Sequence, residues 1–193
     1  KKHDALFVHY GTDYVFDGEK RTPYTETDRP NPLNNYGHGK LEGEELALAS
    51  GARCIVLRLS WVYGQGQQNF IYKLSQWAKN QPELKITADE TSVPTFAGDI
   101  ADITLKAIGA GLSGRWHLTN SGCCSRYEWA QLAVKALGLN VKLVPAKLAD
   151  FNLPAKRPVF SAMSNAALSR ELGVTIPHWS EAAEKFAREL ARG

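Results

Sequence analysis

Two nearly continuous apolar runs constrain the fold of this chain more than any other feature. Residues 5–10 read ALFVHY, and residues 52–64 read ARCIVLRLSWVYG, which is dense in β-branched and aromatic side chains. Runs of this kind are typical of strands that are buried on both faces of a parallel sheet. A helix is predicted between them, from Tyr36 to the Ser50-Gly51 pair. The pattern therefore predicts a strand–helix–strand unit.

The rest of the chain continues to alternate between strand and helix patterns. Strands are predicted at the start of 84–96, in 114–122 and in 140–146, and helices over 69–81, 99–108, 125–138, 165–172 and 181–191. Asp99 is the expected N-cap of the third predicted helix, and Ser125 with Glu128 has the spacing of a capping box. This alternation predicts an α/β fold with a mostly parallel, doubly wound sheet.

Charge and composition exclude several classes of protein. The net charge of +3 comes from scattered basic residues, which argues against a nucleic-acid-binding surface. No apolar run has the length of a membrane span, and the first residues do not have the pattern of a signal peptide. The cysteines (Cys54, Cys123 and Cys124) have no metal-site spacing and are expected to be reduced thiols, which predicts a cytoplasmic protein without a metal site.

Tyr36, Lys40 and Thr12 form the candidate catalytic group. Residues four apart share one face of a helix, so Tyr36 and Lys40 can face one ligand, and Thr12 follows the first strand. A nearby ammonium group favours tyrosinate, and we expect a desolvated Lys–Tyr pair beside a cofactor to promote proton transfer. Taken alone, the Y-x-x-x-K spacing is a weak signal, because it also fits a half-buried tyrosine and a surface lysine.

Three glycines interrupt this helix, at positions 37, 39 and 43. Each interior glycine costs about 1 kcal/mol relative to alanine. We expect them to provide clearance for a ligand and for a closely packed neighbour. His38 is expected to point away from the Tyr36–Lys40 face, into solvent.

Several motifs together resemble one enzyme family. TDYVFDG, PYTETDRPNPLNNYGHGKLEGE, LRLSWVYG, PTFAGDIAD and PAKRPVFSAM occur here in the order and spacing found in dTDP-4-dehydrorhamnose reductases, which are extended short-chain dehydrogenase/reductases. The resemblance covers nearly the whole chain. It implies a partial Rossmann-like fold in which residues 1–193 form one NAD(P)-binding unit, with a small substrate-binding lobe from parts of 61–100 and 120–193.

The resemblance also implies roles for individual residues. Tyr36 would protonate the C4 oxygen of a dTDP-sugar ketone during hydride transfer from NADPH (NADH is the alternative), and Thr12 would orient the carbonyl. Tyr36 and Lys40 would both bind the cofactor, with Lys40 holding the nicotinamide ribose. The remaining residues that it assigns to substrate binding are Tyr14, Trp61, Asn69 and Arg157. The other large aromatics, Phe70, Trp77, Trp116, Trp129 and Trp179, are expected in the core, with Phe70 also near the substrate.

The sequence departs from the family pattern at two points. Gly11 stands where the family usually has serine, and the glycine-rich pyrophosphate-binding turn that opens the family's fold does not precede the first predicted strand in the sequence as given. The segment GQGQQN at 64–69 resembles such a turn but is expected to be an ordinary one. We therefore expect the chain as given to bind NADPH poorly and to turn over slowly.

Three other functions fit parts of the pattern. The regulatory β subunit of methionine adenosyltransferase resembles the same family and acts by binding a partner enzyme. Other nucleotide-sugar dehydratases, epimerases and reductases share the tyrosine–lysine pair. The third alternative is a structural α/β domain without activity. The sequence leaves the oligomeric state open, and a homodimer is compatible with it.

Overall fold

A three-stranded parallel sheet forms one half of the molecule. The structure is a computed structural model that describes residues 5–192. Strands β1 (Phe7–Thr12), β2 (Cys54–Leu59) and β7 (Gly114–His117) lie in the order β1–β2–β7 and are all parallel. The predicted parallel sheet and its first strand–helix–strand unit are confirmed.

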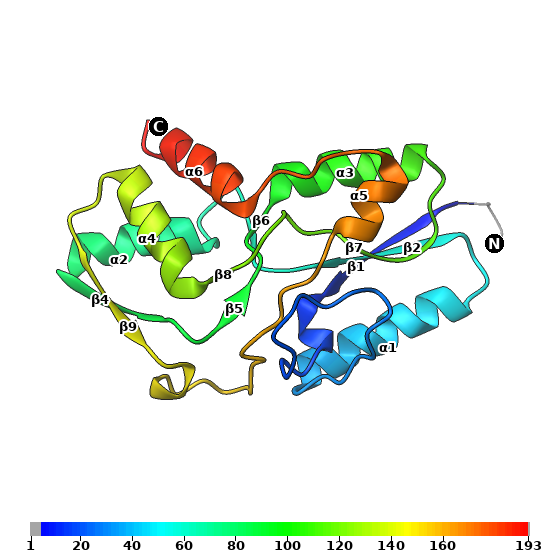
Figure 1. Cartoon of the computed structure of the whole chain (residues 1–193), viewed down its shortest axis with the longest axis horizontal. Coiled ribbons are helices and arrows are strands. Elements are labelled where there is room, and N and C mark those ends of the chain that lie inside the picture. Colours follow the sequence, from blue (N-terminus) through cyan, green and yellow to red (C-terminus); the bar gives the residue numbers. More distant parts are fainter. Residues whose placement is uncertain (1–4, 193) are drawn as a thin grey trace.

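Helices cover both faces of this sheet (Figure 1). Helix α1 (Asn35–Ala49) lies on one face, and α3 (Ala97–Gly109) and α5 (Ala166–Leu172) lie on the other. Val56 of β2 packs against Ala47 of α1, whereas the next residue, Leu57, packs in the cluster that contains Ile103 and Leu168. Successive side chains of a strand point to opposite faces of the sheet, and helices cover both faces. Strand β2 therefore carries apolar side chains on both faces.

The second half has its own, largely aromatic core. Helices α2 (Phe70–Asn80), α4 (Arg126–Leu137) and α6 (Trp179–Leu190) pack with strand β4 (Glu83–Thr87), which pairs in parallel with β9 (Lys142–Ala146). Tyr63, Trp129 and Phe186 are buried in ring–ring contacts at its centre. We call this half the aromatic lobe; in Figure 1 it lies to the left of the sheet.

Short elements connect the two halves. Strand β3 (Val62–Tyr63) pairs with β6 (Thr95–Phe96), and β5 (Thr91–Ser92) pairs with β8 (Cys124–Ser125). Two 3-10 helices complete the fold, η1 (Asp13–Val15) directly after β1 and η2 (Leu148–Asp150) after β9. Within residues 5–192, no helix is both long and apolar enough to cross a membrane.

Most predicted helix ends are confirmed, whereas one predicted N-cap and one predicted strand are wrong. Ser125 and Glu128 form the predicted capping box of α4. Helix α3, however, starts at Ala97 without a side-chain cap, so Asp99 lies inside its first turn, where it accepts a hydrogen bond from Asn120. The single strand predicted across 52–64 is divided into β2 and β3, because the backbone turns at Trp61 with a φ of 35°.

Of the three glycines of α1, Gly37 alone is crowded by other atoms of the chain. A Cβ atom at Gly37 would overlap the carbonyl oxygen of Tyr14, whereas Gly39 faces open space and Gly43 has room for a Cβ atom. Gly37 thus lets the first turn of α1 lie against η1. His38 is exposed, as predicted.

A buried ion pair fixes α1 to the sheet. Glu44 accepts hydrogen bonds from Arg58 Nε at 2.9 Å and Nη2 at 2.8 Å, and both side chains are fully buried. Arg115 on β7 adds a contact from its Nε at 3.3 Å. A Cβ atom at Gly11 would overlap Glu44 Oε1, so the departure from serine at this position has a packing reason.

We expect Glu44→Gln to lower the free energy of unfolding by about 3–5 kcal/mol, because it leaves the buried guanidinium of Arg58 without its counter-charge. The measurement is urea denaturation followed by tryptophan fluorescence. Glu45→Gln is the matched control: Glu45 pairs with Arg115 at the surface, with its side chain 60% exposed, so its loss should cost less than about 1 kcal/mol. Equal losses in the two variants would contradict the assignment.

Candidate functional site

A polar cavity of about 390 Å³ opens at the carboxyl ends of β1 and β2. Its walls are residues 10–13 at the end of β1, Tyr36 and Lys40 from α1, and residues 59–62 after β2. The carboxyl ends of parallel strands are the usual place for a ligand in open α/β sheets. The cavity thus gathers side chains that are far apart in the sequence.

The structure brings the three predicted catalytic residues together. Thr12 ends β1 and is 6% exposed, and Tyr36 and Lys40 stand on the first turns of α1 above it. Lys40 Nζ donates a hydrogen bond to the carbonyl oxygen of Tyr10 at 2.5 Å, which holds the ammonium over the strand end. Tyr36 is 57% exposed, so the described residues alone do not form the desolvated surroundings expected for it.

Tyr14 supports Tyr36 from η1. Their rings meet edge to face, with centroids 5.9 Å apart. Burial raises the pKa of Tyr14 to about 12, with Arg157 nearby opposing the shift and Asp13 adding to it. Tyr14 therefore keeps its proton at neutral pH, and its observed contact with Tyr36 is the ring packing.

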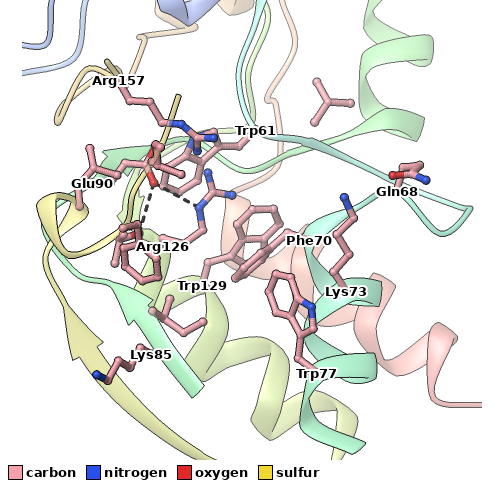
Figure 2. A pocket seen from close by; sticks show the side chains of 16 residues that line it. Trp61, Gln68, Phe70, Lys73, Trp77, Lys85, Glu90, Arg126, Trp129 and Arg157 are labelled. Atoms are coloured by element: carbon pink, nitrogen blue, oxygen red, sulfur yellow. Dashed lines mark hydrogen bonds and ion pairs between the residues drawn. The ribbon is translucent and has the colours of Figure 1, made fainter. Parts of the chain in front are cut away.

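A second cavity, of about 500 Å³, lies in the aromatic lobe. We call it the aromatic cavity; it is lined by Trp61, Phe70, Trp77, Trp129, Arg126 and Arg157 among others. Figure 2 shows the side chains of Arg126 and Arg157 converging near Trp61, with Phe70, Trp129 and Trp77 forming the adjacent wall. Flat rings beside two guanidinium groups suit a ligand with a planar ring and an anionic group.

Arg126 is held in this cavity by several interactions. Its guanidinium lies 3.7 Å from the centroid of the Trp61 ring, and its Nε is 3.6 Å from Glu90 Oε2. Burial lowers the pKa of Arg126, and the carboxylate of Glu90 opposes this shift. Among the described residues, the buried indole nitrogens of Trp61 and Trp129 have no hydrogen-bond acceptor.

Trp61 and Val62 line both cavities. The positive φ of Trp61 places its ring at the boundary between them, and this region of backbone conformation is costly for a bulky residue. The two cavities therefore adjoin at these two residues.

Asn69 lines neither the polar cavity nor the aromatic cavity. Its side-chain amide donates to the carbonyl oxygens of Gly64 and Gly66, both at 2.7 Å, and its Oδ1 accepts from the Tyr72 amide as the N-cap of α2. These contacts favour a structural role over the sugar contact that the family resemblance implies. They also make 64–69 a self-contained turn, in line with our interpretation of GQGQQN.

Sequence reasoning missed part of the aromatic cavity. Arg126 and Glu90 were not predicted, and Trp129 was assigned to the core alone, although it both belongs to the core and borders the cavity. Trp77 was also predicted to be core and is instead 42% exposed. The capping box at the start of α4 predicted that Arg126 begins a helix, but no sequence pattern predicted that Arg126 lies near Trp61.

The family model described as "RmlD substrate binding domain" matches residues 1–192. The chain is 38% identical to a dTDP-4-dehydrorhamnose reductase of Burkholderia thailandensis over 207 residues, which covers 98% of this chain and 70% of the relative.

Two solved structures agree with this. The dTDP-4-dehydrorhamnose reductase of Clostridium acetobutylicum is 36% identical, with a TM-score of 0.93 over 96% of this chain and 66% of that one. The reductase of Bacillus anthracis, solved in complex with NADP, is 31% identical, with a TM-score of 0.91 and the same coverage. The chain thus spans about two thirds of the length of these solved relatives, and its fold is Rossmann-like.

We expect Asn69→Ala to lower the free energy of unfolding by about 1–2 kcal/mol, because it removes the N-cap of α2 and two further hydrogen bonds. Gln67→Ala, an exposed amide in the same turn, is the control and should change stability by less than about 0.5 kcal/mol. Thermal or urea unfolding measures both. An Asn69→Ala variant as stable as the wild type would overturn the capping role and make Asn69 a candidate ligand contact again.

Proposed function

This chain belongs to the RmlD substrate binding domain family, and from this premise we propose that it forms the substrate-binding and acid–base part of a dTDP-4-dehydrorhamnose reductase. The reaction is the NADPH-dependent reduction of the C4 ketone of dTDP-4-dehydro-L-rhamnose to dTDP-L-rhamnose, in dTDP-rhamnose biosynthesis. One observation carries the proposal: the cavity with Thr12, Tyr36 and Lys40 shares Trp61 and Val62 with the aromatic cavity.

A dTDP-sugar matches this pair of cavities chemically. The thymine ring suits the aromatic wall, and the diphosphate suits Arg126 and Arg157, since guanidinium groups bind phosphate oxygens with charge-assisted hydrogen bonds. The sugar then extends past Trp61 into the polar cavity, where its C4 carbonyl comes within reach of Tyr36.

Each residue of the polar cavity has a distinct task. Tyr36 donates its phenolic proton to the C4 oxygen as negative charge develops there. Lys40, anchored on the Tyr10 carbonyl, favours the resulting phenolate electrostatically and can hold a ribose hydroxyl. Thr12 orients the carbonyl oxygen. NADPH, when bound, supplies the hydride to C4.

The described residues fit the nicotinamide end of such a cofactor. Tyr36 is exposed, and Gly39 faces open space beside it, so a ring and a ribose can approach α1 here. NADPH is preferred over NADH in this proposal because a relative of the same family was solved with NADP.

Two alternatives are less well supported. A non-catalytic regulatory subunit has no need of an open cavity at the Tyr36–Lys40 pair, and the three relatives reported above are named as reductases. A second alternative is another nucleotide-sugar enzyme; a solved UDP-galactose 4-epimerase has a similar fold, with a TM-score of 0.78, but at 19% identity it supports the fold alone.

We place this activity in the cytoplasm, where nucleotide sugars and NADPH are available, with a dTDP-sugar as ligand and without a nucleic-acid or membrane partner. A homodimer is compatible with this function. Among residues 5–192, no group of three His, Cys, Asp or Glu side chains could hold a metal ion, and the proposed chemistry does not require one.

We expect Tyr36→Phe to reduce turnover by about 10²–10⁴-fold, because it removes the general acid. The assay follows NADPH absorbance with dTDP-4-dehydro-L-rhamnose, using the chain as given and a version joined to the glycine-rich cofactor segment of a relative. Tyr72→Phe, on α2 and in neither cavity wall, is the control and should keep full activity. No turnover by folded wild-type protein in either form would refute the reductase proposal.

We expect Arg157→Ala to weaken dTDP binding by about 10–100-fold, because it removes a charged hydrogen-bond donor from the aromatic cavity. Calorimetry on the chain as given measures this without any cofactor. Arg170→Ala removes an equal charge from the exposed face of α5, so its affinity should match that of the wild type. Equal weakening in both variants would show that only the net charge matters.

A further inference from the structure

Asp13 is a buried carboxylate in the wall of the polar cavity that the proposed mechanism does not use. It follows Thr12, begins η1 and is 3% exposed. Three hydroxyl groups donate hydrogen bonds to it. Thr12 Oγ1 donates to Oδ1 at 3.3 Å, and Ser92 Oγ and Ser161 Oγ donate to Oδ2 at 3.0 Å and 2.5 Å.

No cationic side chain among residues 5–192 forms an ion pair with Asp13. The charged and titratable groups around it are Arg126 on α4 and Tyr14 on η1, which interact with it electrostatically, and Tyr36 and Lys40 on α1, which line the same cavity. Burial raises the pKa of Asp13 to about 6, although the three hydroxyl donors oppose the shift. Both charge states are therefore accessible near neutral pH.

The side chain of Thr12 can donate only one hydrogen bond. A threonine hydroxyl has a single donor hydrogen and two acceptor lone pairs. The Tyr14 amide occupies one lone pair at 3.3 Å, and the hydrogen is directed at Asp13 Oδ1. A ligand oxygen that needs a donor from Thr12 competes with ionised Asp13 for the same hydrogen.

A protonated Asp13 removes this competition. It can donate from Oδ1 to the second lone pair of Thr12 while Oδ2 still accepts from Ser92 and Ser161. The Thr12 hydrogen is then free to point into the cavity. No bond to carbon forms or breaks in this change; one proton passes from solvent to Asp13.

We propose that Asp13 is a positioning residue that sets the direction of the Thr12 hydroxyl: as a carboxylate it holds the Thr12 hydrogen, and as an acid it turns that hydrogen toward a bound carbonyl oxygen. The carbonyl ligand in this statement rests on the proposed function, whereas the coupling of Asp13 to Thr12 does not. Binding of a ketone sugar should therefore be accompanied by proton uptake at Asp13.

The first measurement is a carboxyl ¹³C NMR titration of Asp13 in the ligand-free chain, with the signal assigned by its loss in Asp13→Asn. Thr12→Val removes one donor to the carboxylate, so the titration of Asp13 should move to higher pH. Ser161→Ala should shift it in the same direction, because Ser161 donates to the same group. An unchanged titration in Thr12→Val would overturn the coupling.

The second measurement is calorimetry in two buffers of different ionisation enthalpy, near pH 7.5, with dTDP-4-dehydro-L-rhamnose and with dTDP. Wild-type protein should take up close to one proton with the ketone sugar and much less with dTDP. Ser161→Ala should keep this uptake when it is measured at a pH well above its own, shifted titration of Asp13. Thr12→Val and Asp13→Asn should both lose the proton uptake. Asp13→Asn should still bind the sugar within a few-fold of wild type, because its side-chain amide can accept hydrogen bonds from Ser92 and Ser161 and donate one to Thr12.

The outcomes separate this inference from the proposed function. Uptake that persists unchanged in Asp13→Asn, or wild-type binding of the ketone sugar without uptake, would refute the role of Asp13. If neither ligand binds, the proposed function fails, and the NMR titration alone then decides whether Asp13 controls Thr12.

Discussion

The placement of the whole polar cavity depends on the buried ion pair between Glu44 and Arg58. Glu44 lies one turn beyond Lys40 on the same face of α1, and Arg58 is the direct neighbour of Gly11 in the sheet register. The pair therefore fixes the rotation of α1 relative to the end of β1, and with it the distance from Tyr36 and Lys40 to Thr12. An apolar contact of the same area would tolerate sliding, whereas two hydrogen bonds to one carboxylate allow a single arrangement. Gly11 is part of this arrangement, since any side chain there would displace the carboxylate.

Trp61 joins the two halves in a different way. The backbone leaves β2 with a positive φ, which ends that strand and turns the indole toward Arg126. Such a conformation persists only where the surroundings hold it, and here Trp129 stacks on the ring from one side while Arg126 lies over it at 3.7 Å. The strain and the contacts together put one aromatic ring in the walls of both cavities.

Buried polar groups, rather than apolar contacts alone, connect the sheet to the aromatic lobe near the site. Asp13 receives hydrogen bonds from Ser92 of β5 and from Ser161, and Ser60 donates to the Val93 carbonyl. Hydrogen bonds of this kind are directional and costly to leave unmade, so they specify how the two halves meet. The same groups adjoin Thr12, which makes the junction and the candidate site one structural unit.

The sequence by itself determined the local elements and the chemistry of the first cavity. Apolar runs predicted β1 and β2, and the Ser125–Glu128 spacing predicted the start of α4. The Tyr36–Lys40 spacing, with Thr12 after β1, predicted a group that the structure brings together. These predictions succeeded because each signal is local or follows from the rules of parallel sheets. Only the tertiary structure decided the rest. Arg126 and Trp61 are 65 positions apart and meet through packing, Trp77 is turned outward by the position of α2, and the reasons for Gly11 and Gly37 are atoms of Glu44 and Tyr14. Contacts between distant segments leave no spacing in the sequence, so they become visible only when the chain is folded.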